Sequence, residues 1–150
     1  MMLKYLNVVV QLADKRVLLY RKHHGGWPQW SVTHEKYLNN EESPLIEANK
    51  ILYNVFGIDP VNYSDDFAIV KQISPIVIMP NRQLNPYIVK MQTLLSFRGE
   101  VEDEYRAFRW DDIIDMIMHD LAGTSTSLNP TFTPTACYAV RGLTNKKVME

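Results

Sequence analysis

Residues 41–59 read EESPLIEANKILYNVFGID, and this stretch decides the fold. Ser43 is a typical N-cap, and Pro44 follows at the first helical position, where the missing proline N–H costs no hydrogen bond. Gly57 predicts the end of the helix, because glycine readily adopts the backbone conformation that ends helices. The sequence therefore predicts a helix of about three turns, from Pro44 to the residue before Gly57.

The predicted helix is amphipathic. At 100° per residue, one broad arc is apolar and consists of Leu45, Ala48, Ile51, Leu52, Val55 and Phe56. Glu47, Lys50 and Asn54 lie on the opposite side. The helix is thus expected to cover a core with its apolar arc and to leave the polar side at a surface or a site.

The sequence on both sides of this helix is rich in β-strand patterns. Residues 5–11 and 16–21 predict a hairpin around a polar turn, and residues 67–79 and 87–97 predict long extended runs separated by proline-containing segments that include Asn85-Pro86. Residues 104–110 predict a further strand, after which Asp111 or Asp112 is expected to cap a helix. A last helix is predicted from Pro134, with Thr133 as its N-cap. This order predicts an α+β fold, a mixed sheet with helices packed on it, in a single domain of residues 1–150.

The composition is that of an ordinary globular protein. The chain has 150 residues, of which 46 % are hydrophobic and 22 % charged, and its formal net charge is -1. This balance gives no general attraction to nucleic acid, so no nucleic-acid partner is expected. Cys137 is the only cysteine, which excludes an internal disulfide. We expect no membrane segment and no signal peptide, so the predicted location is cytoplasmic.

Several of these features together resemble the Nudix family. They are the strand RVLLYRK, a loop with Gly-Gly-Trp, a glutamate, and a helix that ends in Gly-Ile. The family motif runs Gly, five residues, Glu, seven residues, then Arg-Glu-apolar-any-Glu-Glu-any-Gly-apolar. With Gly57-Ile58 as the anchor, Glu42 matches the first glutamate and Leu52 matches the apolar position. FRWDDIIDMI and FTPTACYAVRGL, later in the chain, are similar to the family's last strand and helices, so the resemblance covers most of the sequence.

The motif itself is degenerate. Lys36 stands at the opening glycine, Lys50 stands at the arginine, and the three helix glutamates are replaced by Ile51, Asn54 and Val55. In the family, those glutamates hold Mg²⁺ or a similar cation against a diphosphate. Such ions need several converging oxygen ligands, which two hydrocarbon side chains and one neutral amide do not supply. We therefore expect a weak metal site for Mg²⁺ or Mn²⁺, or none.

The remaining acidic residues define the candidate catalytic and metal-binding positions. Glu42 and Glu47 are the candidates for both roles, with Glu35 as a further carboxylate that could join them. The alternative is structural: Glu42 would favour the positive end of the helix, and Glu47 would be a solvated surface charge. The sequence leaves both interpretations open.

A second group of residues is expected to bind the ligand. Trp27 and Trp30 offer rings on which a nucleobase stacks, and Arg21 offers a guanidinium to phosphate. His34, Lys50 and Asn54 complete the predicted set. The alternative places Trp30 in the core and Trp27 on the surface.

Three functions remain open after this reading. The first interpretation is a Nudix-like protein that binds a nucleotide or a diphosphate-containing ligand with weak or no hydrolysis. The alternative is an active hydrolase of nucleoside diphosphate-linked compounds with a rearranged metal site, and a third is an interaction protein with a vestigial cleft. A homodimer is also conceivable, because the apolar segment at residues 76–79 could pair with a second chain.

Overall fold

The computed structural model describes residues 2–22, 29–32, 34–39, 41–56, 68–79, 81–92, 103–121 and 132–149. These ranges contain the strands and helices of one mixed sheet with helices on it. The strands are β1 Leu3–Gln11, β2 Val17–Lys22, β3 His34–Leu38, β4 Ala68–Gln72, β5 Ile76–Met79, β6 Arg82–Met91 and β7 Asp103–Phe108. The helices are α1 Pro44–Phe56, α2 Trp110–Leu121 and α3 Pro134–Asn145.

The centre of the sheet is the pair β1 and β6. The strand order is β4-β6-β1-β2-β7, while β3 pairs with β1 and β5 pairs with β6. β1 and β6 run parallel, with Leu3 opposite Arg82 and Gln11 opposite Lys90. Residues 6–11 and 84–89 are buried without interruption, as expected for parallel strands that are covered on both faces. The predicted mixed α+β sheet is confirmed.

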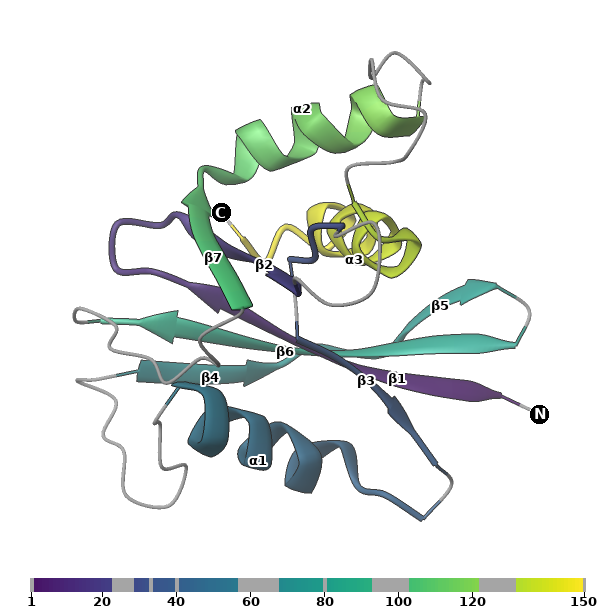
Figure 1. The fold of residues 1–150 in the computed structure, drawn as a ribbon. Helices are drawn as coiled ribbons and strands as arrows, with labels where there is room; N and C mark the ends of the chain where they lie inside the picture. The colour runs from purple at the N-terminus through teal and green to yellow at the C-terminus, as the bar shows by residue number, and fades with distance from the viewer. Residues whose placement is uncertain are drawn as a thin grey trace.

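The helices form layers on the two faces of this sheet. Figure 1 shows α1 below the sheet and α2 and α3 above it. We call these the α1 face and the α3 face. Under α1, Ala48 and Leu52 pack against side chains of the sheet such as Leu6, Tyr87 and Val89. In the part of the chain that the structure describes, every helix falls short of the length and hydropathy that spanning a membrane requires.

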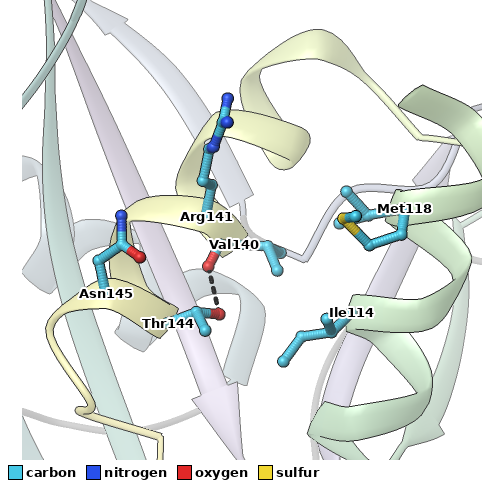
Figure 2. A pocket seen from close by; sticks show the side chains of 7 residues that line it. Ile114, Met118, Val140, Arg141, Thr144 and Asn145 are labelled. Carbon is cyan, nitrogen blue, oxygen red and sulfur yellow. Dashed lines mark hydrogen bonds between the residues drawn. The ribbon is translucent and has the colours of Figure 1, made fainter. Parts of the chain in front are cut away.

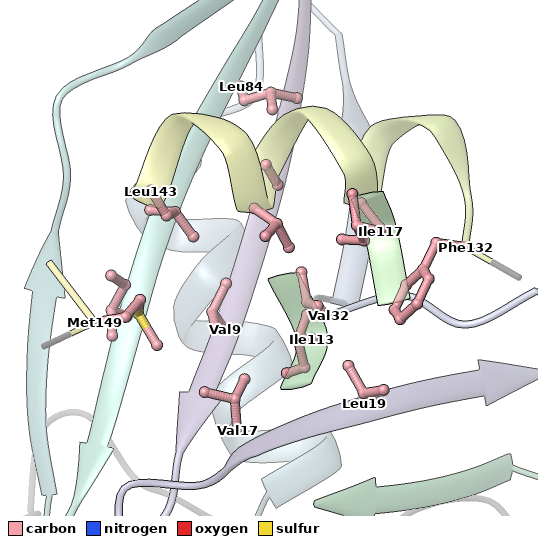
Figure 3. Close-up of a cluster of buried hydrophobic side chains, with 14 residues drawn as sticks. Val9, Val17, Leu19, Val32, Leu84, Ile113, Ile117, Phe132, Leu143 and Met149 are labelled. Carbon is pink, nitrogen blue, oxygen red and sulfur yellow. The ribbon is translucent and has the colours of Figure 1, made fainter. Parts of the chain in front are cut away.

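The α3 face holds the larger apolar core, which Figure 3 shows. α3 contributes a stripe at helical spacing, Ala136, Ala139, Val140 and Leu143. Ile113 and Ile117 of α2 are also buried in this core. The strands contribute Val9, Val17 and Leu19, which lie beneath the two helices. Both helices are therefore fixed to the sheet by buried hydrocarbon.

The predicted hairpin of β1 and β2 is confirmed. Gln11 pairs with Val17 in antiparallel register, and the turn is closed by a hydrogen bond of 2.7 Å from the Leu12 N–H to the Arg16 carbonyl. The Asp14 carboxylate accepts from the backbone N–H of Arg16 at 3.1 Å and from its Nε at 2.6 Å. These bonds lower the pKa of Asp14. The turn is thus held by its own side chains.

The prediction that Asn85-Pro86 interrupts the second sheet region is wrong. β6 passes through both residues and reaches back to Arg82. β5 pairs with residues 82–84 of β6, and β4 pairs with residues 87–91, so Pro86 falls between the two partners. A residue without an N–H is tolerated there because neither ladder needs it. The run predicted at residues 67–79 is likewise two strands, with Pro75 in the break between them.

The helix boundaries follow local chemistry in two cases and depart from it in one. α1 begins at Pro44 as predicted, while Gly57 lies outside the described residues. Thr133 is the N-cap of α3, as predicted. α2 begins at Trp110, so Asp111 and Asp112 lie in its first turn instead of capping it. Their charge favours the positive helix end from that position.

Replacing Thr133 with alanine is expected to reduce the free energy of unfolding by about 1 kcal/mol. The Thr133 Oγ1 accepts from the Ala136 N–H at 3.1 Å and lies 3.0 Å from Oε1 of Glu35, to which it donates. Alanine removes both bonds, whereas serine keeps the hydroxyl. Urea denaturation of the two variants measures the difference. Equal losses for alanine and serine would show that the hydroxyl does not stabilise α3.

Candidate functional site

Lys36 occupies the centre of the candidate site on the α1 face. Alternation along β3 places His34, Lys36 and Leu38 on one face of the strand, and Leu38 is buried in the core beneath α1. The Lys36 ammonium Nζ lies 2.7 Å from Oε2 of Glu42 and 2.5 Å from Oε2 of Glu47. One lysine therefore joins the two carboxylates that the sequence assigned to a metal.

The second oxygen of each carboxylate also has a partner. Oε1 of Glu47 accepts from the Lys50 ammonium at 3.1 Å, and Oε1 of Glu42 accepts from the Asn39 N–H at 3.1 Å. We call Lys36, Glu42, Glu47 and Lys50 the Lys36 cluster. Its two ammonium groups and two carboxylates give a formal charge of zero. The two carboxylates are thus neutralised by the two lysine side chains alone.

These contacts shift the pKa values of the cluster. Hydrogen bonds to Glu42 and then to Glu47 raise the pKa of Lys36. The hydrogen bond from Lys36 is the main cause that lowers the pKa of Glu42, and the Asn39 N–H adds to it. Lys36 and then Lys50 lower the pKa of Glu47. At neutral pH, Glu42 and Glu47 are therefore negatively charged and Lys36 is positively charged.

The interpretation of Glu47 as a solvated surface charge is wrong. Glu47 is only 7 % exposed, and its two carboxylate oxygens accept hydrogen bonds from Lys36 and Lys50. A carboxylate so far removed from solvent requires a cation or several donors. The structure supplies that cation from the chain itself.

The residues at the family's metal positions do not fit a divalent cation. Ile51 and Val55 pack against the core beneath α1, and Asn54 is exposed on the opposite side of the helix. Among the residues with described positions, no group of three or more His, Cys, Asp or Glu side chains is placed to hold a metal ion. Glu42 and Glu47 converge, yet the Lys36 ammonium lies between them. A hard cation would have to displace this lysine and would then find only two carboxylates.

Aromatic side chains lie beside the Lys36 cluster on the same face. The ring of Tyr20 lies 4.0 Å from that of His34 and 5.2 Å from that of Tyr105, measured between centroids. His34 Nε2 and the Tyr105 hydroxyl share a hydrogen bond of 3.0 Å. The cavity that these rings line has a volume of only about 10 Å³, the space of one water molecule. The rings thus fill the inner part of this region.

Two of the predicted ligand residues lie on the α3 face. Val17, Leu19 and Arg21 alternate towards that face along β2, and Trp30 packs against the same core. The Arg21 guanidinium lies 4.6 Å from the centroid of Trp30, and that of Arg106 lies 5.7 Å from it. The structure therefore brings Lys50 into contact with Glu47 and places His34 on the same face of β3 as Lys36, but Arg21 and Trp30 lie on the opposite face of the sheet. Trp27 lies outside the described residues.

Glu35 does not join the other carboxylates. Alternation along β3 directs it away from Lys36, and its Oε1 accepts from the Ser31 hydroxyl at 2.9 Å and from Thr133. The protein packed around its carboxyl raises the pKa of Glu35, although these two hydrogen bonds act in the opposite direction. Glu35 thus connects β3 to the start of α3 and does not contact Glu42 or Glu47 through these hydrogen bonds.

Sequence reasoning missed Lys36, Tyr20 and Tyr105 as members of the site. Lys36 was visible as a charged residue at the glycine position, six residues before Glu42. That signal shows a departure from the motif but not the direction of the side chain. Tyr20 and Tyr105 come together only because β2 pairs with β7, with Tyr20 opposite Tyr105.

Comparison with solved structures assigns this architecture to the Nudix fold. The protein DR0079 from Deinococcus radiodurans superposes with a TM-score of 0.66 at 7 % identity, over 93 % of this chain and 81 % of that one. Tm1382, described as a candidate Nudix hydrolase, gives 0.59 at 8 % identity, over 97 % and 72 %. The C-terminal domain of mouse MUTYH, solved in complex with human PCNA, gives 0.62 at 13 % identity, over 98 % and 90 %.

The likeness is one of fold. No protein-family model matches the sequence, and no curated protein matches it either. The chain thus has a Nudix-like fold, and Lys36 bridges a pair of carboxylates, Glu42 just before α1 and Glu47 within it.

Proposed function

We propose that this protein is a metal-independent binding domain of Nudix-like fold, which holds a nucleotide or another diphosphate-containing ligand without hydrolysing it. The observation that carries the proposal is the Lys36 ammonium between Glu42 and Glu47. A tethered ammonium replaces the charge of a cation. It does not supply the Lewis acidity that activates water or polarises a phosphoryl group.

The neighbouring side chains support binding of such a ligand. Lys50 donates to Glu47, but 61 % of its side chain is exposed, so its remaining protons face solvent. The rings of Tyr20, His34 and Tyr105 contact one another, and alternation along β3 places His34 on the same strand face as Lys36. A nucleobase can stack on an aromatic ring of this kind. A phosphate group beside Lys50 and a base against these rings would use both features.

The proposal predicts that ligand binding needs no metal. With excess EDTA, the chain is titrated with ADP-ribose, a dinucleotide and a nucleoside triphosphate, and its unfolding temperature is followed. A ligand at about 100 times its Kd is expected to raise Tm by on the order of 5–10 °C for a chain of this size. No phosphate is expected to be released, with or without Mg²⁺.

Two variants localise the effect. Lys50→Gln is expected to weaken the stabilisation, while Lys4→Gln, which removes an exposed lysine at the start of β1, is expected to leave it unchanged. A panel without any effect on Tm, in EDTA and in Mg²⁺ alike, would contradict the proposed binding function.

A hydrolase with a rearranged metal site is the second candidate. It is favoured by one observation, the convergence of Glu42 and Glu47 on a single point. If a divalent cation displaced Lys36 during turnover, phosphate release would require Mg²⁺ and would disappear in Glu42→Gln and in Glu47→Gln. The same assay therefore distinguishes the two functions.

A further inference from the structure

A cleft between α2 and α3 lies on the α3 face, away from the Lys36 cluster. Its volume is about 440 Å³, which is within the range of about 300–1,000 Å³ typical of small-molecule sites. Figure 2 shows Val140 and Thr144 of α3 facing Ile114 and Met118 of α2 across this space. The cleft is thus formed by side chains of two helices that are both anchored in the core beneath them.

The inner walls of the cleft are apolar. Ile114 and Val140 lie on its two sides, and Met118 contributes a flexible side chain that is 60 % exposed. The Thr144 hydroxyl donates to the Val140 carbonyl at 2.7 Å, so its proton is already used within α3. An exposed methionine beside an apolar cleft is typical of surfaces that adapt to hydrocarbon ligands.

One end of the cleft is cationic. Arg141 and Asn145 line it, and in Figure 2 the Arg141 guanidinium extends from α3 away from Ile114. Among the described residues, no carboxylate forms an ion pair with Arg141. The mouth therefore offers guanidinium and amide donors, next to a space that hydrocarbon can fill.

We propose that this cleft binds a small amphipathic carboxylate, with its hydrocarbon chain between α2 and α3 and its carboxylate on Arg141. The planar guanidinium matches a carboxylate with two parallel hydrogen bonds. A single arginine offsets one negative charge, so a carboxylate fits better than a phosphate monoester, which carries more than one. The cleft is a second site, independent of any ligand on the α1 face.

The test is a calorimetric titration of the chain with decanoate, kept below the concentration at which it forms micelles. Saturable binding is expected, and octanoate, which has two fewer CH₂ groups, is expected to bind about fifteenfold more weakly, because each buried CH₂ strengthens binding about fourfold. Decanol lacks the charge and acetate lacks the chain, so both are expected to bind more weakly than decanoate.

Two exposed cations of the same helix region supply the matched variants. Arg141→Gln is expected to weaken decanoate binding about tenfold or more, while Lys146→Gln, which alters a residue outside the lining, is expected to leave it unchanged. Decanol is expected to bind both variants as it binds the unaltered chain.

Four results would overturn the proposal. They are the absence of saturable binding, equal binding of decanoate and decanol, an unchanged affinity in Arg141→Gln, and an equal loss in Lys146→Gln. Sedimentation of the unaltered chain adds a fifth, since a dimer that decanoate dissociates would assign the cleft to a second copy of the protein.

Discussion

Replacing Lys36 with methionine is expected to lower Tm at neutral pH and to raise the pKa values of Glu42 and Glu47. Methionine keeps the length and the apolar stem of lysine but removes the ammonium. Two carboxylates would then lie close together with only Lys50 left to offset them, and removing one partner of such a group leaves an uncompensated charge. The carboxyl pKa values can be followed by NMR titration.

The same variant is expected to lose most of the pH dependence that the cluster gives to stability. The pKa values of Glu42 and Glu47 are lowered from 4.5 in the folded protein, so their contribution is present above pH 4.5 and is lost as pH falls through the folded values. The pKa of Lys36 is raised from 10.5. Its contribution is present below pH 10.5 and is lost as pH rises through the folded value. Urea denaturation across both windows measures these slopes.

A triple variant provides the control for this prediction. Adding Glu42→Gln and Glu47→Gln to Lys36→Met removes the repulsion between the two carboxylates that the loss of the ammonium creates, so Tm is expected to recover in part. Lys36→Met alone is also expected to bind Mg²⁺ weakly, with a Kd on the order of a millimolar, because two carboxylates become accessible. Unchanged stability and unchanged carboxyl pKa values in Lys36→Met would show that the lysine does not hold the pair.

The second large effect is expected in the core beneath α1. Leu52→Ala should reduce the free energy of unfolding by about 3 kcal/mol, since Leu52 is fully buried and its loss leaves a cavity between helix and sheet. Leu45→Ala, on the same helix, is expected to change it by less than about 0.5 kcal/mol, because Leu45 is exposed. Urea denaturation of the pair tests the packing of α1. Similar losses of unfolding free energy at both positions would show that α1 does not pack on the sheet through Leu52 as described.

Leu45 illustrates how far helical periodicity reaches. The pattern correctly predicts that Ala48 and Leu52 face the core, but it also includes Leu45, which the structure exposes. Periodicity gives the direction of a side chain around the helix axis. It does not show which turns of the helix the sheet covers. The helix start at Pro44 and the Thr133 cap were predictable because both depend on neighbouring residues only.

The sheet and the site depend on contacts between distant residues. Pro86 looks like a chain break from its neighbours, yet it lies where β4 and β5 leave a gap along β6, which no local signal reveals. Alternation along β2 does predict that Tyr20 and Arg21 point to opposite faces of the sheet, but it does not show which helix covers each face. Lys36 contacts Glu47 across eleven positions of sequence through the packing of β3 beneath α1. Motif comparison aligns Lys36 with a glycine, but only the fold shows that its ammonium contacts both Glu42 and Glu47.

The central claim is that Lys36 occupies the position at which a divalent ion would neutralise Glu42 and Glu47. Calorimetric titration of the unaltered chain with Mn²⁺ at neutral pH tests it most directly. We expect no saturable heat up to millimolar concentrations of the ion. Saturable binding that is abolished in Glu42→Gln and Glu47→Gln would contradict the account, because it would show that the carboxylates prefer the ion to the lysine.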